Sequence, residues 1–117
     1  MQLEHYGVNL NGKETGIYKV YIRITTKMYS GKRCQLSMFR KLNEQQYQII
    51  MDTDLNVIVD TSDFNEETIS KFKTFIIINK VKLENLWENG MKWMDLEFQE
   101  FCDTLKVSKV EFKQFGE

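Results

Sequence analysis

Apolar and polar residues alternate through the first half of the chain. In residues 16–29 the apolar side chains are two apart, and those of one face are Tyr18, Val20, Ile22 and Ile24. A spacing of two predicts a long, half-buried β-strand. Tyr6, Val8 and Leu10 alternate in the same way before the turn residues Asn11 and Gly12, which predicts a short opening strand in a hairpin.

Three more strands are predicted between residues 34 and 59. After a turn at residues 30–33, the apolar residues Cys34, Leu36 and Met38 alternate with Gln35, Ser37 and Phe39. Residues 47–51 fit a strand or a short helix that begins at Asn43, and we favour the strand. The Asp and Asn side chains of residues 52–56 favour a turn, and the β-branched run 57–59 then predicts a strand paired with the preceding one.

The spacing becomes helical after Asp63. Asp63 and Glu66 have the spacing of a capping box, and apolar residues follow at steps of three or four as far as Asn89-Gly90, which favours a helix end. These signals predict a helix over about residues 65–88. The three isoleucines within residues 75–78 leave a strand open as an alternative, which would divide the helix into two shorter elements.

The remaining residues predict a second helix and a last strand. Apolar residues at helical spacing are Met94, Phe98, Phe101 and Leu105, and residues 107–115 alternate as in a strand that returns to the sheet. We therefore expect one α+β domain over residues 1–117, with a mainly antiparallel sheet of four or five strands packed against one long and one shorter helix. Its predicted core is Tyr18, Val20, Ile22, Ile24, Phe72, Ile76, Leu83, Phe98 and Phe101.

The composition is that of a globular protein. Apolar residues make up 42% and charged residues 28% of the chain, so we expect it to fold unaided. The longest apolar run, residues 75–78, is far shorter than the roughly 18 residues that span a membrane, and the N-terminal residues lack the features of a signal peptide. We expect a cytoplasmic protein without a membrane partner. The absence of proline and the many Lys, Ile and Asn residues suggest an AT-rich bacterial or phage source.

Few residues have the chemistry that catalysis requires. The single histidine, His5, lies near a terminus, and no nucleophile-elbow, zinc-protease or phosphate-loop motif occurs. Cys34 and Cys102 belong to no C-x-x-C pair, which predicts two buried thiols. A calcium-loop spacing is present at Asp52, Asp54, Asn56, Asp60 and Asp63. Val57 stands where such a loop requires glycine, so we expect these residues to form a turn and a helix cap, with no metal, cofactor or enzymatic activity.

Charge is unevenly distributed along the chain. Residues 1–41 contain eight Lys and Arg and two acids (net +6), whereas residues 42–117 contain eight and fifteen (net −7). Aromatic and basic side chains on one strand face can stack bases and neutralise phosphates. The candidate nucleic-acid-binding residues are Lys19, Tyr21, Arg23, Lys27, Lys32 and Arg33. We favour instead an ordinary solvated sheet face, or pairing of the two charged halves within the domain.

Aromatic and methionine residues gather around Gly90. Such residues are enriched at the centres of protein interfaces. The candidate protein-binding residues are Trp87, Met91, Trp93 and Met94. The alternative is that both tryptophans complete the core between the helices. This cluster, or an exposed strand edge, also allows a homodimer.

Two segments show a resemblance to a known family. Residues 49–59 form two strands across a polar turn, and residues 83–88 (Leu-Glu-Asn-Leu-Trp-Glu) end the long helix. In these features the chain resembles, over residues 45–90, a family of short uncharacterised bacterial proteins that are often encoded beside partners of toxin–antitoxin type. The resemblance implies an antitoxin-like binding protein and carries no functional residue with it.

The sequence thus favours a function in binding. We expect a non-enzymatic regulator or inhibitor that binds one protein partner, of the antitoxin-like type or the phage anti-defence (anti-CRISPR-like) type. The alternative is a nucleic-acid-binding module that uses the basic, aromatic strand face.

Overall fold

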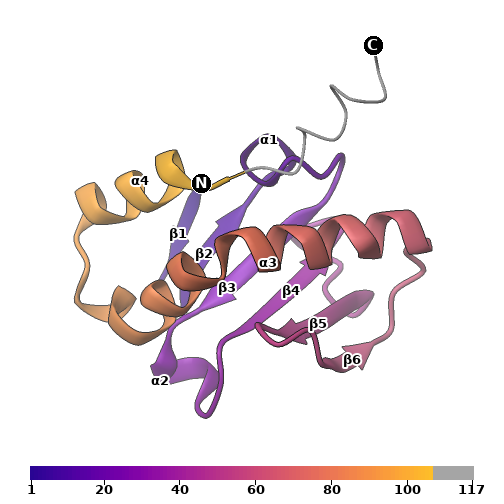
Figure 1. The fold of residues 1–117 in the computed structure, drawn as a ribbon, viewed down its shortest axis with the longest axis horizontal. Coiled ribbons are helices and arrows are strands. Elements are labelled where there is room, and N and C mark those ends of the chain that lie inside the picture. Colours follow the sequence, from indigo (N-terminus) through magenta and orange to yellow (C-terminus); the bar gives the residue numbers. More distant parts are fainter. Residues whose placement is uncertain (107–117) are drawn as a thin grey trace.

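The computed structural model describes residues 1–106 as an α+β domain (Figure 1). Its centre is an antiparallel sheet in which the strands follow one another in chain order. The strands are β1 (Gln2–Glu4), β2 (Gly7–Leu10), β3 (Tyr21–Thr25), β4 (Gln35–Phe39), β5 (Gln48–Asp52) and β6 (Val57–Asp60). The α+β class and the antiparallel sheet are confirmed, with six strands in place of the expected four or five, because β1 was not predicted.

The helices lie at one face of the sheet and at its ends. They are α1 (Gly12–Thr15), α2 (Lys27–Ser30), α3 (Glu66–Asn89), the 3₁₀ turn η1 (Gly90–Lys92) and α4 (Asp95–Thr104). The long helix α3 crosses the sheet, and α4 follows it beside β1 (Figure 1). One long and one shorter helix were expected, and both are present. The strand predicted at residues 107–115 lies outside the described residues.

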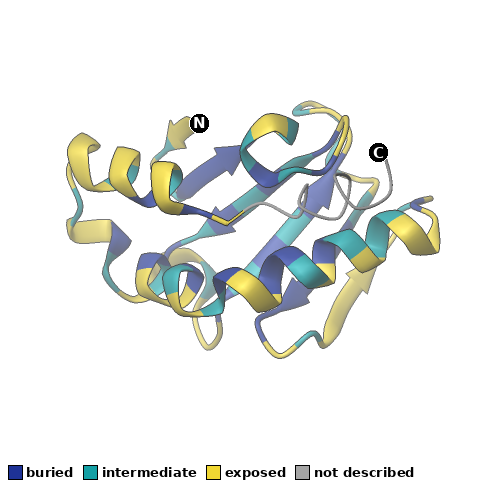
Figure 2. Cartoon of the chain, turned by 45° about the horizontal axis from the view of Figure 1, so that its top comes forward, coloured by how far each residue is buried: buried dark blue, intermediate teal, exposed yellow. Residues whose placement is uncertain are grey.

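The core forms between the sheet and α3. The strand register places Val8, Ile24, Leu36 and Met51 in one row and Leu10, Ile22, Met38 and Ile49 in the next. All of these side chains are buried, and α3 covers them with Phe72, Phe75, Ile76, Leu83 and Leu86. Figure 2 shows the resulting stripe of buried residues along α3 and the exposed residues opposite. The period of two in the strands and the helical spacing in α3 therefore point at the same core.

The predicted strand over residues 16–29 is wrong in its length. Only residues 21–25 are extended, because Gly16 ends α1 with a φ of 80° and Lys19 has a φ of 57°. A left-handed residue cannot continue a strand. Tyr18 therefore lies outside the sheet with 78% of its surface exposed, whereas it was expected in the core. Phe98, also expected there, is half-buried at the edge of the core.

Residues 75–78, for which the sequence left a strand open as an alternative, are part of helix α3. All four are helical, and Phe75 and Ile76 are fully buried against the sheet. Burial of these side chains outweighs the weak strand preference of the isoleucines. The helix begins about where it was predicted, but its cap differs from the prediction: Asn65, and not Asp63, accepts a hydrogen bond from the Thr68 N–H at 2.8 Å. Asp63 instead pairs with Arg40.

The described residues contain no helix that is both long enough and apolar enough to cross a membrane. The long helix α3 carries charged residues in every turn or two, as its sequence shows.

Candidate functional site

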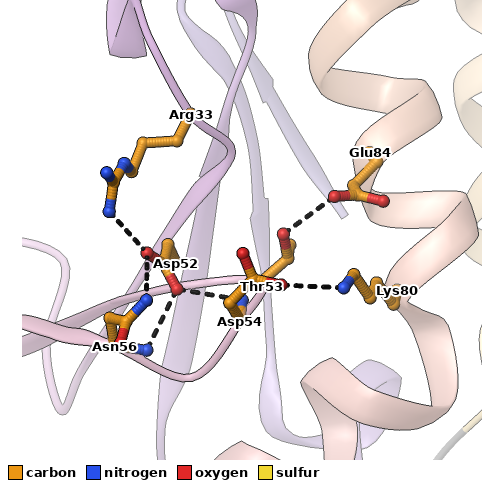
Figure 3. A network of polar contacts seen from close by, with 7 residues as sticks. All are labelled: Arg33, Asp52, Thr53, Asp54, Asn56, Lys80 and Glu84. Atoms are coloured by element: carbon orange, nitrogen blue, oxygen red, sulfur yellow. Dashed lines mark hydrogen bonds and ion pairs between the residues drawn. The ribbon is translucent and has the colours of Figure 1, made fainter.

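The turn between β5 and β6 is organised by the buried carboxylate of Asp52. This carboxylate accepts hydrogen bonds from the backbone N–H of Asp54 (2.9 Å) and of Asn56 (3.0 Å) and from the Asn56 side-chain amide (3.1 Å). Arg33 donates to its second oxygen at 2.9 Å (Figure 3). The expected role of this acid in a turn is confirmed, and both of its oxygens are occupied by groups of the chain itself.

The environment of Asp52 stabilises its charged form. Burial alone would raise its pKa, but the hydrogen bonds from Asn56, Asp54 and Arg33 outweigh burial, and the pKa lies below its ordinary value. Asp52 is 4% exposed at its side chain, whereas Arg33 is 60% exposed. The buried carboxylate therefore fixes Nη1 of the Arg33 guanidinium, while more than half of the Arg33 side chain is exposed.

Two contacts dock this turn onto α3. The Thr53 hydroxyl donates to Glu84 Oε2 at 2.9 Å, and Lys80 Nζ lies 2.9 Å from Asp54 Oδ1 (Figure 3). The hydrogen bond to Asp54 is also the main cause of a raised pKa of Lys80. Residues about 30 positions apart in the chain are thus brought to one place.

An open groove of about 580 Å³ lies between this turn, the segment before β4 and the end of α3. Its lining residues are Lys32, Arg33, Cys34, Asp52, Thr53, Asp54, Asn56, Glu84, Trp87 and Glu88. We call it the Trp87 groove. It is lined by charged groups of both signs around one large aromatic ring.

Trp87 is fixed in this groove by its neighbours from α2. Its indole N–H donates to Ser30 Oγ at 2.8 Å. The Lys27 ammonium lies 5.4 Å from the centre of its ring and 3.5 Å from Glu88 Oε1. The ring is half-buried and packs against the core, so its orientation is set by the chain itself.

Both thiols are held in the protonated form. Burial, with the nearby carboxylates of Glu84 and Asp52, raises the pKa of Cys34 to about 12, and its Sγ donates to the Leu83 carbonyl at 3.6 Å. Burial and a hydrogen bond to Glu14 raise the pKa of Cys102 to about 12 as well. The thiolate is the reactive form of cysteine, so these thiols are poor nucleophiles near neutral pH.

The predicted protein-binding residues do not form one surface. Trp87 lines the groove described above, while Trp93 packs edge-on against Phe98 and lines a separate groove beside α4. Met91 and Met94 lie at the corner between α3 and α4 and are 51% and 73% exposed. Each tryptophan thus belongs partly to the core, as the alternative interpretation held, and partly to a surface.

The predicted nucleic-acid-binding residues are also divided. Lys32 and Arg33 line the Trp87 groove, and Lys27 contacts its ring. Lys19 and Tyr21 line a groove of about 400 Å³ elsewhere, beside Arg40 and Lys41. Because Lys19 and Lys27 lie outside β3, the candidate basic residues do not form one continuous strand face.

Arg23 lies on the sheet face opposite α3, where it is engaged within the chain. Its guanidinium is 4.6 Å from the Tyr6 ring centre and 5.3 Å from that of Phe39. It donates to Asn9 Oδ1 at 3.3 Å and to Gln45 Oε1 at 2.7 Å. These contacts give Arg23 a structural role in this face.

Sequence reasoning did not select Glu84 and Glu88 as site residues. A signal was available, because Glu84 lies three residues before Trp87 and four residues before Glu88 on a predicted helix, which places Glu84 next to both. The charged residues that face them come from distant segments, and no local pattern places them there.

Within residues 1–106 no group of three or more His, Cys, Asp or Glu side chains is arranged to hold a metal ion. Fold and groove together define an α+β domain with a six-stranded antiparallel meander and a charged, aromatic surface groove. In comparisons with known proteins, the chain matches no family model, no curated protein and no solved structure. The resemblance to the bacterial family over residues 45–90 therefore stays a prediction.

Proposed function

We propose that the protein is a non-enzymatic regulator or inhibitor that binds one protein partner through the Trp87 groove. The antitoxin-like and anti-defence (anti-CRISPR-like) types are the forms of this function that we favour. The observation that carries the proposal is the half-buried Trp87 ring in a groove of about 580 Å³, a size that accommodates side chains of a partner.

The residue types in the groove are those on which binding energy concentrates. Trp and Arg are enriched among the few residues that dominate interface energetics. Trp87 is held by Ser30, and Arg33 is held by Asp52, so both lose little conformational freedom on binding. Such preorganisation lowers the entropic cost of association.

Affinity capture of the tagged protein from bacterial lysate, with and without nuclease, tests the proposal. We expect to capture one stoichiometric protein partner whether or not nuclease is added. Trp87→Ala should weaken the affinity for this partner about thirtyfold. Because Trp87 also touches the core, Glu88→Lys provides a second variant at an exposed lining position and is expected to weaken binding without changing the circular dichroism spectrum. Tyr18→Ala, an exposed aromatic outside the groove, is the matched control.

A nucleic-acid-binding module remains the second candidate. It is supported by the groove beside Lys19, Tyr21, Arg40 and Lys41, whose lining includes three basic residues and no acidic residue. Arg40 and Lys41 are partly neutralised by Asp63 and Glu44. If the captured material is nucleic acid, or disappears with nuclease and is unaffected by Trp87→Ala, the second candidate replaces the first.

A further inference from the structure

The Trp87 groove also indicates what part of a partner it recognises. Resting on the proposed function, we infer that it binds a cationic side chain of the partner protein, an arginine or lysine, held against the Trp87 ring between Glu84 and Glu88. The inference follows from the placement of these three residues, from their local energetics and from a contact that the chain makes with its own Lys27.

The three residues form one face of α3. Glu84 lies three residues before Trp87 and four residues before Glu88, so it stands about one helical turn from each, and Trp87 and Glu88 are consecutive. All three line the groove. The Thr53 hydroxyl bonds Oε2 of Glu84, and Lys27 approaches Oε1 of Glu88. An aromatic face flanked by carboxylates is a favourable environment for a cation.

Glu88 stands at a position that the local energetics of the helix disfavour. Like charges four residues apart repel by about 0.2–0.5 kcal/mol. Glu88 also stands in the last turn of α3, where the helix dipole is negative and no basic residue is present. Conflicts of this kind concentrate at functional positions. A bound cation would relieve both the repulsion and the unfavourable position.

Lys27 shows that an ammonium group fits against this face. Its Nζ is 5.4 Å from the Trp87 ring centre and 3.5 Å from Glu88, and about half of each charged side chain is exposed. Exposed pairs of this kind contribute little to stability, with typical values of about 0–1 kcal/mol. Lys27 therefore occupies the cation position next to Trp87 and Glu88, and a partner's guanidinium or ammonium group can displace it.

The charges on the other walls favour one cation at this position. Asp52 pairs with Arg33 at 2.9 Å, whereas Glu84 and Glu88 line the α3 wall. Burial is the main cause of the raised pKa of Cys34, and the nearby carboxylates of Glu84 and Asp52 add to it. Lys32 on the opposite wall is exposed and has no ion-pair partner within residues 1–106. A partner's cation is thus attracted to the α3 wall and repelled from the Lys32 wall.

The test uses the peptide N-acetyl-Gly-Arg-Gly-amide and its citrulline analogue, which has the same shape without the charge. Binding is followed by NMR through the indole N–H signal of Trp87, assigned with Trp87→Phe. We expect saturable shifts with the arginine peptide only. Glu84→Gln and Glu88→Gln should each weaken binding about two- to fivefold, as expected for loss of one exposed charge pair. Glu66→Gln, an exposed acid at the far end of α3, should have no effect.

Lys27→Met gives a prediction of opposite sign. Removal of the internal cation should strengthen arginine-peptide binding, by a similar two- to fivefold factor. Equal binding of the citrulline peptide, or unchanged binding in Lys27→Met and both glutamine variants, would overturn the inference. Capture of a protein that requires Trp87 but tolerates both glutamine substitutions would retain the proposed function and reject the cation. Arginine-dependent shifts without any captured protein partner would retain the cation site and reject the proposed function.

Discussion

Asp52 connects the sheet to the Trp87 groove. It is buried at the end of β5, accepts two backbone hydrogen bonds that shape the following turn, and holds the exposed Arg33. Leu55 adopts a left-handed φ of 68° in this turn, a conformation that requires support from its neighbours. The groove wall formed by residues 52–56 therefore depends on one carboxylate.

We expect Asp52→Ala to destabilise the fold by about 3 kcal/mol, because two backbone N–H groups and one guanidinium lose a buried acceptor. Urea unfolding measures the loss. Asp54→Ala in the same turn removes only an exposed pair with Lys80 and should be much closer to wild type. An equal loss in both variants would show that Asp52 does not organise the turn.

The same variant predicts a pH dependence. The pKa of Asp52 is lowered on folding, so its contribution is fully present above the unfolded value, near 3.8, and is lost as the pH falls through the lower folded value. The stability difference between wild type and Asp52→Ala should therefore shrink in acid below pH 3.8 and stay constant at neutral pH.

At the scale of the elements, helix α3 determines how the groove is presented. It runs from Glu66 to Asn89, so one side can bury Phe72 and Leu83 while another presents Glu84 and Trp87. Its start decides the register of every later side chain. Asn65, whose side chain accepts from the Thr68 N–H, fixes that start.

Asn65→Ala should cost about 1 kcal/mol of stability, the usual loss for a helix cap. Thermal or urea unfolding provides the measurement. Asp63→Ala is the control, since Asp63 makes only an exposed pair with Arg40 and is expected to have the smaller effect. The reverse order of the two losses would indicate that Asp63 is the cap after all.

At the scale of the whole molecule, the two charged halves of the chain face each other. Lys27, Arg33 and Arg40 of the basic half pair with Glu88, Asp52 and Asp63 of the acidic half. Two of these pairs border the Trp87 groove. Part of the charge asymmetry seen in the sequence is thus neutralised by ion pairs within the fold.

The position of the core is tested by a pair of aromatic substitutions. Phe72→Ala should cost about 3–5 kcal/mol, because Phe72 is fully buried between sheet and helix. Tyr18→Ala should change stability by less than about 0.5 kcal/mol, because Tyr18 is exposed. Denaturant unfolding of both variants distinguishes this core from the one expected from alternation alone, in which Tyr18 would also be costly to remove.

The sequence by itself determined the elements whose signal is local. Alternation identified the strands around Ile22 and Leu36, and helical spacing identified α3 and α4, because side-chain burial repeats with the backbone period. The turn at residues 52–56 was likewise readable from its Asp and Asn side chains.

Only the tertiary structure decided where these elements meet. The left-handed backbone at Lys19 removed Tyr18 from the core, although the alternation continued unbroken through it. The Trp87 groove joins Arg33, Asp52 and Glu84, which are far apart in the chain. Periodicity reports which side of its own element a residue occupies, whereas the neighbours of that side depend on how all the elements pack, and this packing created the groove.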